Sequence, residues 1–402
     1  MSSVDSAVST AKDRLSQGLL DWDVSKGDLD AISAEVDKLS PQERNEFISK
    51  LSDDDIKNWT QEIDGMMGSL SKGERSDLFN KLAEGMDATQ TARFVRAFDG
   101  DNGGREALAD AIASHGSSDA KTGFIDAVKG DIGDEYSATQ GTWGNAETVA
   151  VGKVLASLGN DPAAFQEAVG SLSKEQLQDV MSVAMGRRHI VDFSGRTAGT
   201  NQYDPSALTG ILNAAQGADL PTRTAVFEAA MPQLKTMQND DVGLLGAGAS
   251  IDGVAQAMGK VLSMEEASKA GLINVPEAPP GVSMDANIAD THKHEFPNPG
   301  DMLWFKEQVQ GGGPWDFKTQ GAQYENYGNF HFGVIAAAMD IPEQIGLRGA
   351  GYVQIESNTT QDGWGKPYDL GDSSYGDDPR DQAQIKAGYE YYNSGMWRVW
   401  SD

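Results

Sequence analysis

The stretch LSPQERNEFISKL at residues 39–51 returns in similar form as LSKGERSDLFNKL at residues 70–82, and a shorter copy, LSKEQ, begins at Leu172. In each copy a Ser is followed three residues later by Glu or Gln. This is the capping box of a helix start, in which both side chains bind backbone N–H groups that lack a partner. Apolar residues such as Phe47 and Leu51 then follow at helical spacing. The repeat predicts short helices packed as hairpins, and the uneven spacing of the copies indicates an irregular bundle.

Composition changes near residue 280. Residues 281–402 hold 18 of the 31 aromatic residues of the chain and five of its eight Trp. The preceding part is helical in pattern and poor in aromatic residues, and five Pro between residues 276 and 299 preclude a continuous helix there. We therefore expect a helical carrier over 1–273, with a Gly-rich break near 100–145 between two sub-bundles, a Pro-rich linker over 274–300 and a compact domain over 301–402.

The predicted fold class is mostly α, with a C-terminal domain that is α or α+β. In that domain we expect a helix from Asp301 to Val309 that ends at the Gly-rich turn 311–314. Another helix is expected from Phe332 to Met339, and a last one from Pro379 with Asp378 as its N-cap. Short strands are expected near Gly351 to Ser357 and at the very end of the chain.

Charge and composition exclude several classes of protein. The formal charge is −29, of which −10 belongs to residues 281–402 and −19 to residues 1–280. Neither part attracts phosphate backbones, so nucleic acid is an unlikely partner. The absence of Cys excludes disulfides, thiolate zinc sites and cysteine nucleophiles. No apolar run predicts a membrane span or a secretory signal, so we expect a soluble chain that is exported without a cleavable signal peptide.

Short polar motifs among aromatic and Gly residues mark the C-terminal domain. They are WF at 304–305, GGPWDFK at 312–318, YENYGNFHFG at 324–333, RGAG at 348–351, WGKPY at 364–368 and YGDDPRDQ at 375–382. In this order they resemble the polymorphic toxin type 44 domain, over roughly residues 297–395. The resemblance implies an antibacterial effector that a secretion apparatus delivers into a competing bacterium and that a cognate immunity protein neutralises in the producer. It does not extend to the carrier, which could bind a secretion component or an adaptor protein.

Glu325 is the first catalytic candidate, because it lies between Tyr324 and Tyr327 in a stretch rich in aromatic residues. Burial raises the pKa of a carboxyl, since desolvation disfavours the charge, and such a group can donate a proton as a glycosidase acid does. The alternative is an exposed Glu without a catalytic role. A glycosidase also needs a second carboxylate across the scissile bond. The candidates are Asp316, Asp377 and Asp340.

His331 alternates with Phe330 and Phe332, so it is either a general base, a metal ligand or a hydrogen-bonded core residue. The spacing of His292 and His294 suits zinc binding, with His331 as a third ligand. The main expectation is that the domain needs no cofactor or metal.

For each remaining candidate, a structural role is weighed against a functional one. Asp378 and Asp381 are accounted for by the start of the last helix, so Asp377 is the better catalytic candidate. Arg348 could hold an anionic group or pair with a buried carboxylate, and Asp316 with Lys318 is an ordinary ion pair by default. Most aromatic side chains are expected in the core. The candidate substrate-binding residues are Arg348, Tyr324, Tyr327, Asn329, Trp315 and Trp364.

Three functions compete. The first is a toxin that hydrolyses peptidoglycan in the periplasm of the target cell, with a glycosidase-like acid/base mechanism at Glu325. The second is a ribonuclease or other nucleic-acid-cleaving toxin in the target cytoplasm that uses His331, Arg348 and Lys318, which a net charge of −10 disfavours. The third is a non-enzymatic binding module. Short irregular motifs are where sites tend to lie, so we favour a hydrolase.

Overall fold

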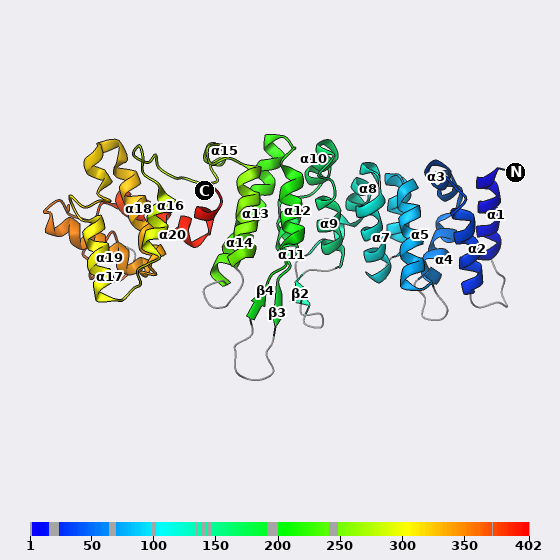
Figure 1. The fold of residues 1–402 in the computed structure, drawn as a ribbon, viewed down its shortest axis with the longest axis horizontal. Helices are drawn as coiled ribbons and strands as arrows, with labels where there is room; N and C mark the ends of the chain where they lie inside the picture. Colours follow the sequence, from blue (N-terminus) through cyan, green and yellow to red (C-terminus); the bar gives the residue numbers. More distant parts are fainter. Residues whose placement is uncertain are drawn as a thin grey trace. The chain divides into compact units, whose positions relative to one another are not determined.

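The computed structural model describes the chain except for residues 1, 16–23, 64–69, 99–101, 134–135, 138–141, 144–145, 191–199, 241–247, 372 and 402. The chain divides into two compact units, Met1–Gln233 and Leu234–Asp402. Helices make up most of both units, which confirms the mostly α fold class (Figure 1). Within the described ranges, no helix has the length and apolar character that a membrane span needs.

The first unit consists mainly of short helices. In chain order they are α1 (Ser3–Leu15), α2 (Lys26–Val36), α3 (Pro41–Lys50), α4 (Asp53–Ile63), α5 (Lys72–Gly85), α6 (Ala88–Ala97), α7 (Asn102–His115), α8 (Ser118–Val128), α9 (Ala146–Ala156), α10 (Pro162–Gly170), α11 (Lys174–Ala184), α12 (Ser206–Ala215) and α13 (Leu220–Asp240), which crosses the boundary between the units.

All three predicted capping boxes are confirmed. Ser40, Ser71 and Ser173 are the N-caps of α3, α5 and α11, and each exchanges hydrogen bonds with the residue three positions later. Ser25 and Ser263 form two further boxes, with Asp28 and Glu266. Recurrent helix starts of this kind give the short helical hairpins that the sequence predicts.

The helices of the first unit pack in succession. Helix α3 contacts α5, α5 contacts α7 and α7 contacts α9, while α4, α6 and α8 contact one another in the same stepwise manner. Figure 1 shows this part as a succession of helical hairpins. Trp59 of α4 is buried edge-on against Phe47 and Phe94, so consecutive layers share one apolar core.

Between α8 and α9 and between α11 and α12 the chain forms a small antiparallel sheet, which the sequence analysis did not predict. Its order is β1 (Tyr136–Ser137), β2 (Thr142–Trp143), β3 (Arg188–Ile190) and β4 (Thr200–Gln202). Thr142 pairs with Arg188, and Arg188 pairs with Gln202. The predicted break near 100–145 lies partly outside the described residues; its part at 142–143 joins this sheet.

The second unit contains α14 (Gly248–Val261), α15 (Met264–Lys269), α16 (Met284–Thr291), α17 (Pro299–Val309), α18 (Glu325–Ala338), α19 (Glu343–Glu356) and α20 (Pro379–Asn393), with short 3-10 turns at Phe317–Gln320, Ala322–Tyr324 and Met396–Arg398. The core of this unit is the packing of α18 on α20. Their backbones touch, since a Cβ on Gly388 would lie 2.1 Å from the Phe330 carbonyl oxygen and one on Gly333 would lie 2.1 Å from that of Ile385. Only Gly at these positions permits so close a crossing.

Several local predictions are corrected by the second unit. Helix α17 begins at Pro299 with Asn298 as its N-cap rather than at Asp301. Part of the expected linker 274–300 folds as α16, and its Ile288 is buried in the core. Helices α14 and α15, grouped with the carrier by sequence, belong to the same compact unit as the C-terminal motifs.

The strands expected in the C-terminal domain are wrong. The segment from Gly351 to Ser357 forms the end of α19 and its C-cap, and the end of the chain forms a 3-10 turn. β-Branched Val353 and Ile355 favour a strand locally, but packing decides otherwise. A Cβ on Gly351 would lie 2.1 Å from the Tyr375 carbonyl oxygen, so the small residue lets α19 lie against that segment.

Candidate active site

A buried carboxyl, that of Asp377, lies just before α20. Asp378 is the N-cap of this helix and accepts a hydrogen bond from the Arg380 N–H, as the sequence predicted. Asp377 is only 3% exposed. Its Oδ1 accepts the Asp378 N–H at 3.0 Å, and its Oδ2 accepts the Gln382 side-chain N–H at 2.8 Å. Each oxygen of the carboxyl thus has a fixed donor.

The surroundings of Asp377 favour its protonated form. Burial raises the pKa of Asp377, and the nearby carboxylate of Asp381 raises it further, while Gln382 and Lys318 act in the opposite direction. Lys318 binds Asp381, with Nζ to Oδ2 at 3.4 Å. Two carboxyl groups one helical turn apart, with a lysine beside them, are an arrangement suited to acid/base chemistry.

Lys318 does not form the predicted ion pair with Asp316. The Asp316 carboxylate instead accepts the Gly312 N–H at 2.7 Å and closes the Gly-rich turn after α17. This bond gives Asp316 a structural role at the turn. Asp340 follows the opposite end of α18, where it interacts electrostatically with Tyr392.

Glu325 is the first residue of α18 and is exposed, so the burial expected for it is wrong. The aromatic residues beside it in sequence do not enclose it, because a helix turns successive side chains to different sides. The Arg380 guanidinium, whose pKa is raised chiefly by its hydrogen bond with Asp378, also interacts electrostatically with Glu325.

The backbone before Asp377 is strained. Tyr375 has a φ of 55°, which is uncommon for a residue with a side chain, and it is buried. Its hydroxyl oxygen lies 2.9 Å from two possible acceptors of its proton, Gln344 Oε1 and the Gly371 carbonyl oxygen. Strain of this kind persists only where the surroundings impose it, and it often accompanies functional sites.

Arg348 supplies part of that support. Its guanidinium donates to the Pro367 carbonyl and, at 2.8 Å, to the Asp369 carbonyl, and it lies 4.5 Å from the centre of the Tyr375 ring. The sequence predicted an anionic group or a carboxylate as its partner. The structure shows backbone carbonyls instead, so Arg348 ties the loop that contains Pro367 and Asp369 to helix α19.

Two of the predicted aromatic residues lie beside the catalytic candidates. The Trp364 carbonyl accepts the Gly376 N–H at 2.8 Å, next to Asp377 in the chain, and its side chain is half-buried. Tyr324 directly precedes Glu325 and is also half-buried.

His331 is a core residue. It is 1% exposed, and burial lowers its pKa to about 3, so it is neutral at physiological pH. Its Nε2 lies 2.9 Å from the side-chain nitrogen of Asn287 on α16. The rings of Trp315 and Phe317 pack edge-on against it. Of the possibilities left open by the sequence, the hydrogen-bonded core residue matches this geometry.

Tyr327 and Asn329 are buried on the same helix. Burial raises the pKa of the Tyr327 phenol. The Tyr327 hydroxyl and the Asn329 amide nitrogen make no hydrogen bond to any described residue. Neither side chain is open to a substrate from solvent.

The structure does not bring the three candidate zinc ligands together. His292 is hydrogen-bonded to the Tyr392 hydroxyl at 2.7 Å, and His294 to Asp301 at 2.9 Å. His331 has its own partner, described above. Among the described residues, no group of three or more His, Asp or Glu could hold a metal ion.

Gln382 was not singled out from the sequence, and Asp381 and Lys318 were assigned other roles. A signal was present in the motif DDPRDQ. Once a helix is expected from Pro379, residues four and five positions after Asp377 fall one turn further on the same side. Lys318 offered no such signal, because its partner is 63 positions away.

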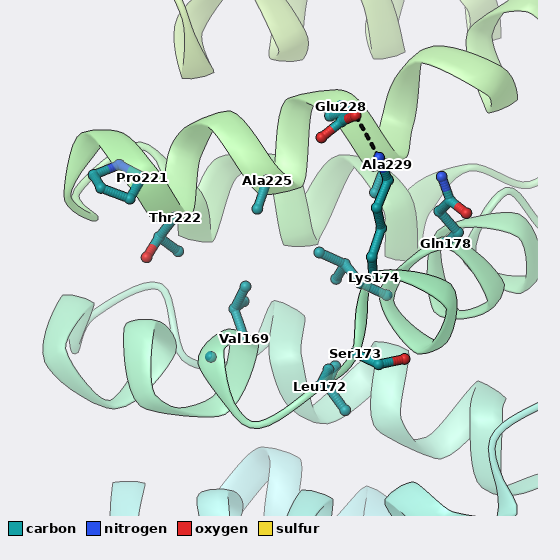
Figure 2. Close-up of a pocket in the computed structure, with 12 residues that line it drawn as sticks. Val169, Leu172, Ser173, Lys174, Gln178, Pro221, Thr222, Ala225, Glu228 and Ala229 are labelled. Carbon is teal, nitrogen blue, oxygen red and sulfur yellow. Dashed lines mark hydrogen bonds and ion pairs between the residues drawn. The ribbon is translucent and has the colours of Figure 1, made fainter. Parts of the chain in front are cut away.

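The first unit has a groove of about 350 Å³, shown in Figure 2. Its lining is largely apolar, and Val169 near the end of α10 points toward Ala225 in the first half of α13. An ion pair between Lys174 and Glu228, at 2.6 Å, crosses one side. The groove contains none of the catalytic candidates.

Comparison with known proteins finds a family that matches part of the chain. Residues 316–394 match the family model described as Bacterial toxin 44, and this span includes Lys318, Glu325 and Asp377. No curated protein and no solved structure matches the chain. The match confirms the resemblance drawn from the ordered motifs. The chain therefore has a bacterial toxin 44 domain at its C-terminus, preceded by a helical N-terminal part.

Proposed function

We propose that the toxin domain is a hydrolase that cleaves a glycosidic bond of the target cell wall, with Asp377 as general acid and Glu325 as the second carboxylate. The observation that supports it most directly is the buried Asp377 carboxyl, held by two hydrogen bonds at the start of α20, where Arg380 interacts electrostatically with Glu325. Glycosidases need two carboxyl groups in different environments, one protonated and one ionised.

The two carboxyl groups take different roles because their surroundings differ. Asp377, whose pKa is raised by burial, is assigned the proton that passes to the leaving oxygen as the glycosidic bond breaks. Glu325 is in contact with solvent and activates a water molecule or supports the developing positive charge on the sugar. Asp381 is less suited to that second role, since it is bound to Lys318.

Substrate binding is assigned to the half-buried rings near the carboxyl groups. Trp364 and Tyr324 offer flat apolar faces on which a sugar ring can pack. The other predicted binding residues have structural positions. Trp315, Tyr327, Asn329 and Arg348 pack in or against the core or hold a loop.

A nuclease is less well supported. The residues proposed for phosphodiester cleavage are already engaged: His331 is buried, Arg348 holds backbone carbonyls and Lys318 pairs with Asp381. The net charge of −10 over residues 281–402 also repels nucleic acid.

The wider role follows from this proposal. We place the site of action in the periplasm of a target bacterium, where the wall is accessible, after secretion without a cleaved signal peptide. The helical part over residues 1–273 is the part that a secretion component or adaptor would recognise. A cognate immunity protein would protect the producing cell.

The test uses the full chain, produced in bacteria with and without an added signal peptide. Toxicity only after export, together with release of reducing sugar ends from purified peptidoglycan by the isolated protein, is the expected result. Asp377→Asn and Glu325→Gln should each lower the cleavage rate by about 100-fold or more. Glu307→Gln, an exposed carboxyl on α17, is the matched control and should be fully active. Toxicity only in the cytoplasm, with loss of RNA, would replace the proposal with the nuclease.

A further inference from the structure

Gln382 is a buried polar side chain in the first turn of α20, and it touches both the proposed acid and a neighbouring helix. It is 4% exposed. Its Nε2 donates to Asp377 Oδ2 at 2.8 Å and to the Leu347 carbonyl of α19 at 3.0 Å. We propose that Gln382 is a positioning residue that holds the Asp377 carboxyl in the orientation needed for proton donation. This proposal rests on the proposed function.

The Leu347 carbonyl decides how the amide of Gln382 is turned. A backbone carbonyl only accepts hydrogen bonds, so the amide must present its NH₂ group on this side and not its oxygen. The same NH₂ group then faces Asp377, so Asp377 Oδ2 must accept a hydrogen bond from it. The second oxygen of Asp377 accepts the Asp378 N–H. Both oxygens therefore have a donor in a fixed place, and the plane of the carboxyl cannot rotate freely.

This arrangement also limits how strongly Asp377 holds its proton. A donor directed at a carboxyl favours the ionised form, so the Gln382 amide opposes the effect of burial. A general acid works best when its pKa lies near the working pH, neither far above nor far below it. Gln382 thus acts on both the geometry and the acidity of the same group.

The position of Gln382 is not explained by stability alone. Its Oε1 is buried and has no hydrogen-bond partner among the described residues. Burial of an unpaired amide oxygen is unfavourable, and an apolar side chain of the same length would avoid it. Gln384, two residues further along α20, also has a buried Oε1 without a described partner, but its side chain makes no hydrogen bond to Asp377. It therefore provides a matched control.

The experiment compares Gln382→Met with Gln384→Met in the full chain. Hydrolysis of purified peptidoglycan is measured as a function of pH, and the titration of Asp377 is followed by its ¹³C-labelled carboxyl signal, assigned by its loss in Asp377→Asn. For Gln382→Met we expect the Asp377 titration and the alkaline limb of the rate profile to move up by about one pH unit, because a hydrogen bond to the ionised form is lost. We also expect a maximal rate lower by about tenfold, because orientation is lost. Gln384→Met should match the wild type in all three.

The outcomes separate this proposal from the proposed function. If Asp377→Asn is inactive while Gln382→Met keeps the wild-type titration and rate profile, the assignment of Gln382 is overturned and the acid role of Asp377 stands. If Asp377→Asn keeps full activity, both fail. If Gln382→Met does not fold, as judged by circular dichroism, Gln382→Glu takes its place. Its additional carboxylate should raise the Asp377 titration by repulsion, and an unchanged titration would again overturn the assignment.

Discussion

Replacing His331 with Phe should make the toxin domain less sensitive to acid. The folded protein lowers the pKa of His331 from its ordinary value of 6.5 to about 3, because the ring is buried. The unfolded chain therefore binds this proton more readily than the folded one. The contribution of His331 to stability is fully present when the pH is above its ordinary pKa. It is lost as the pH falls towards the pKa of the folded state.

The magnitude follows from the two pKa values. Each pH unit between them is worth about 1.4 kcal/mol, so the free energy of unfolding falls by about 2 kcal/mol between pH 6.5 and 5. At pH 3 the loss reaches about 5 kcal/mol. A typical domain is stable by only about 5–15 kcal/mol, so one histidine accounts for a large part of the acid sensitivity.

The assay is urea unfolding of the full chain at pH 7, 6 and 5, and unfolding is monitored by hydrogen exchange in peptides from α18. This readout is needed because the chain has two compact units. His331→Phe leaves the Asn287 amide without its partner, so its stability at pH 7 will be lower by about 1–3 kcal/mol. The decisive quantity is therefore the change between pH 7 and 5, which should be smaller in the variant by about 2 kcal/mol.

Tyr327→Phe is the matched control, since Tyr327 is buried beside His331 on the same helix and does not titrate in this range. It should keep the wild-type pH dependence. Equal pH dependence in the wild type and in His331→Phe would refute the reasoning, because it would mean that the folded protein accepts the proton as readily as the unfolded chain.

Three further changes test the site. Burial raises the pKa of Asp377, so the contribution of this carboxyl to stability is present at low pH and is lost as the pH rises through its pKa in the folded state. In calorimetry, Asp377→Asn should therefore raise the melting temperature at pH 7 but not at pH 3. Gly351→Ala places a methyl group 2.1 Å from the Tyr375 carbonyl oxygen and should cost about 1–3 kcal/mol in urea unfolding. Gly349→Ala in the same helix meets no atom within 4 Å and should leave stability unchanged or raise it by up to about 1 kcal/mol. Arg348→Lys cannot donate to two carbonyls in one plane, so limited proteolysis of the loop at 364–371 should become faster.

Local rules explain how much of this fold the sequence predicts. A capping box is defined within four residues, so Ser40, Ser71 and Ser173 could be identified without knowledge of the rest of the chain. The start of α20 at Pro379 was predictable for the same reason, as a Pro at the first position after a capping Asp is a local signal. The motifs of the toxin domain were likewise contiguous stretches whose order could be compared.

The incorrect predictions concern contacts between distant residues. Lys318 was paired with Asp316 because the two are neighbours in sequence, but its partner Asp381 comes from another helix. Glu325 was expected to be buried because aromatic residues flank it in sequence, whereas the helix directs Tyr327 into the core and leaves Glu325 in solvent. Both errors arise because proximity along the chain does not give proximity in the folded domain.

The segment 375–382 combines three features that each work against stability. Tyr375 has a strained backbone, Asp377 is a buried carboxyl and Gln382 has an unpaired amide oxygen. The tight crossing of α18 and α20 and the support from Arg348 offset these costs. If the segment served only to start a helix, the capping by Asp378 would be sufficient and the other features would be dispensable. Their concentration within eight residues is the pattern expected where stability is given up for chemistry, which supports the proposed site at this end of α20.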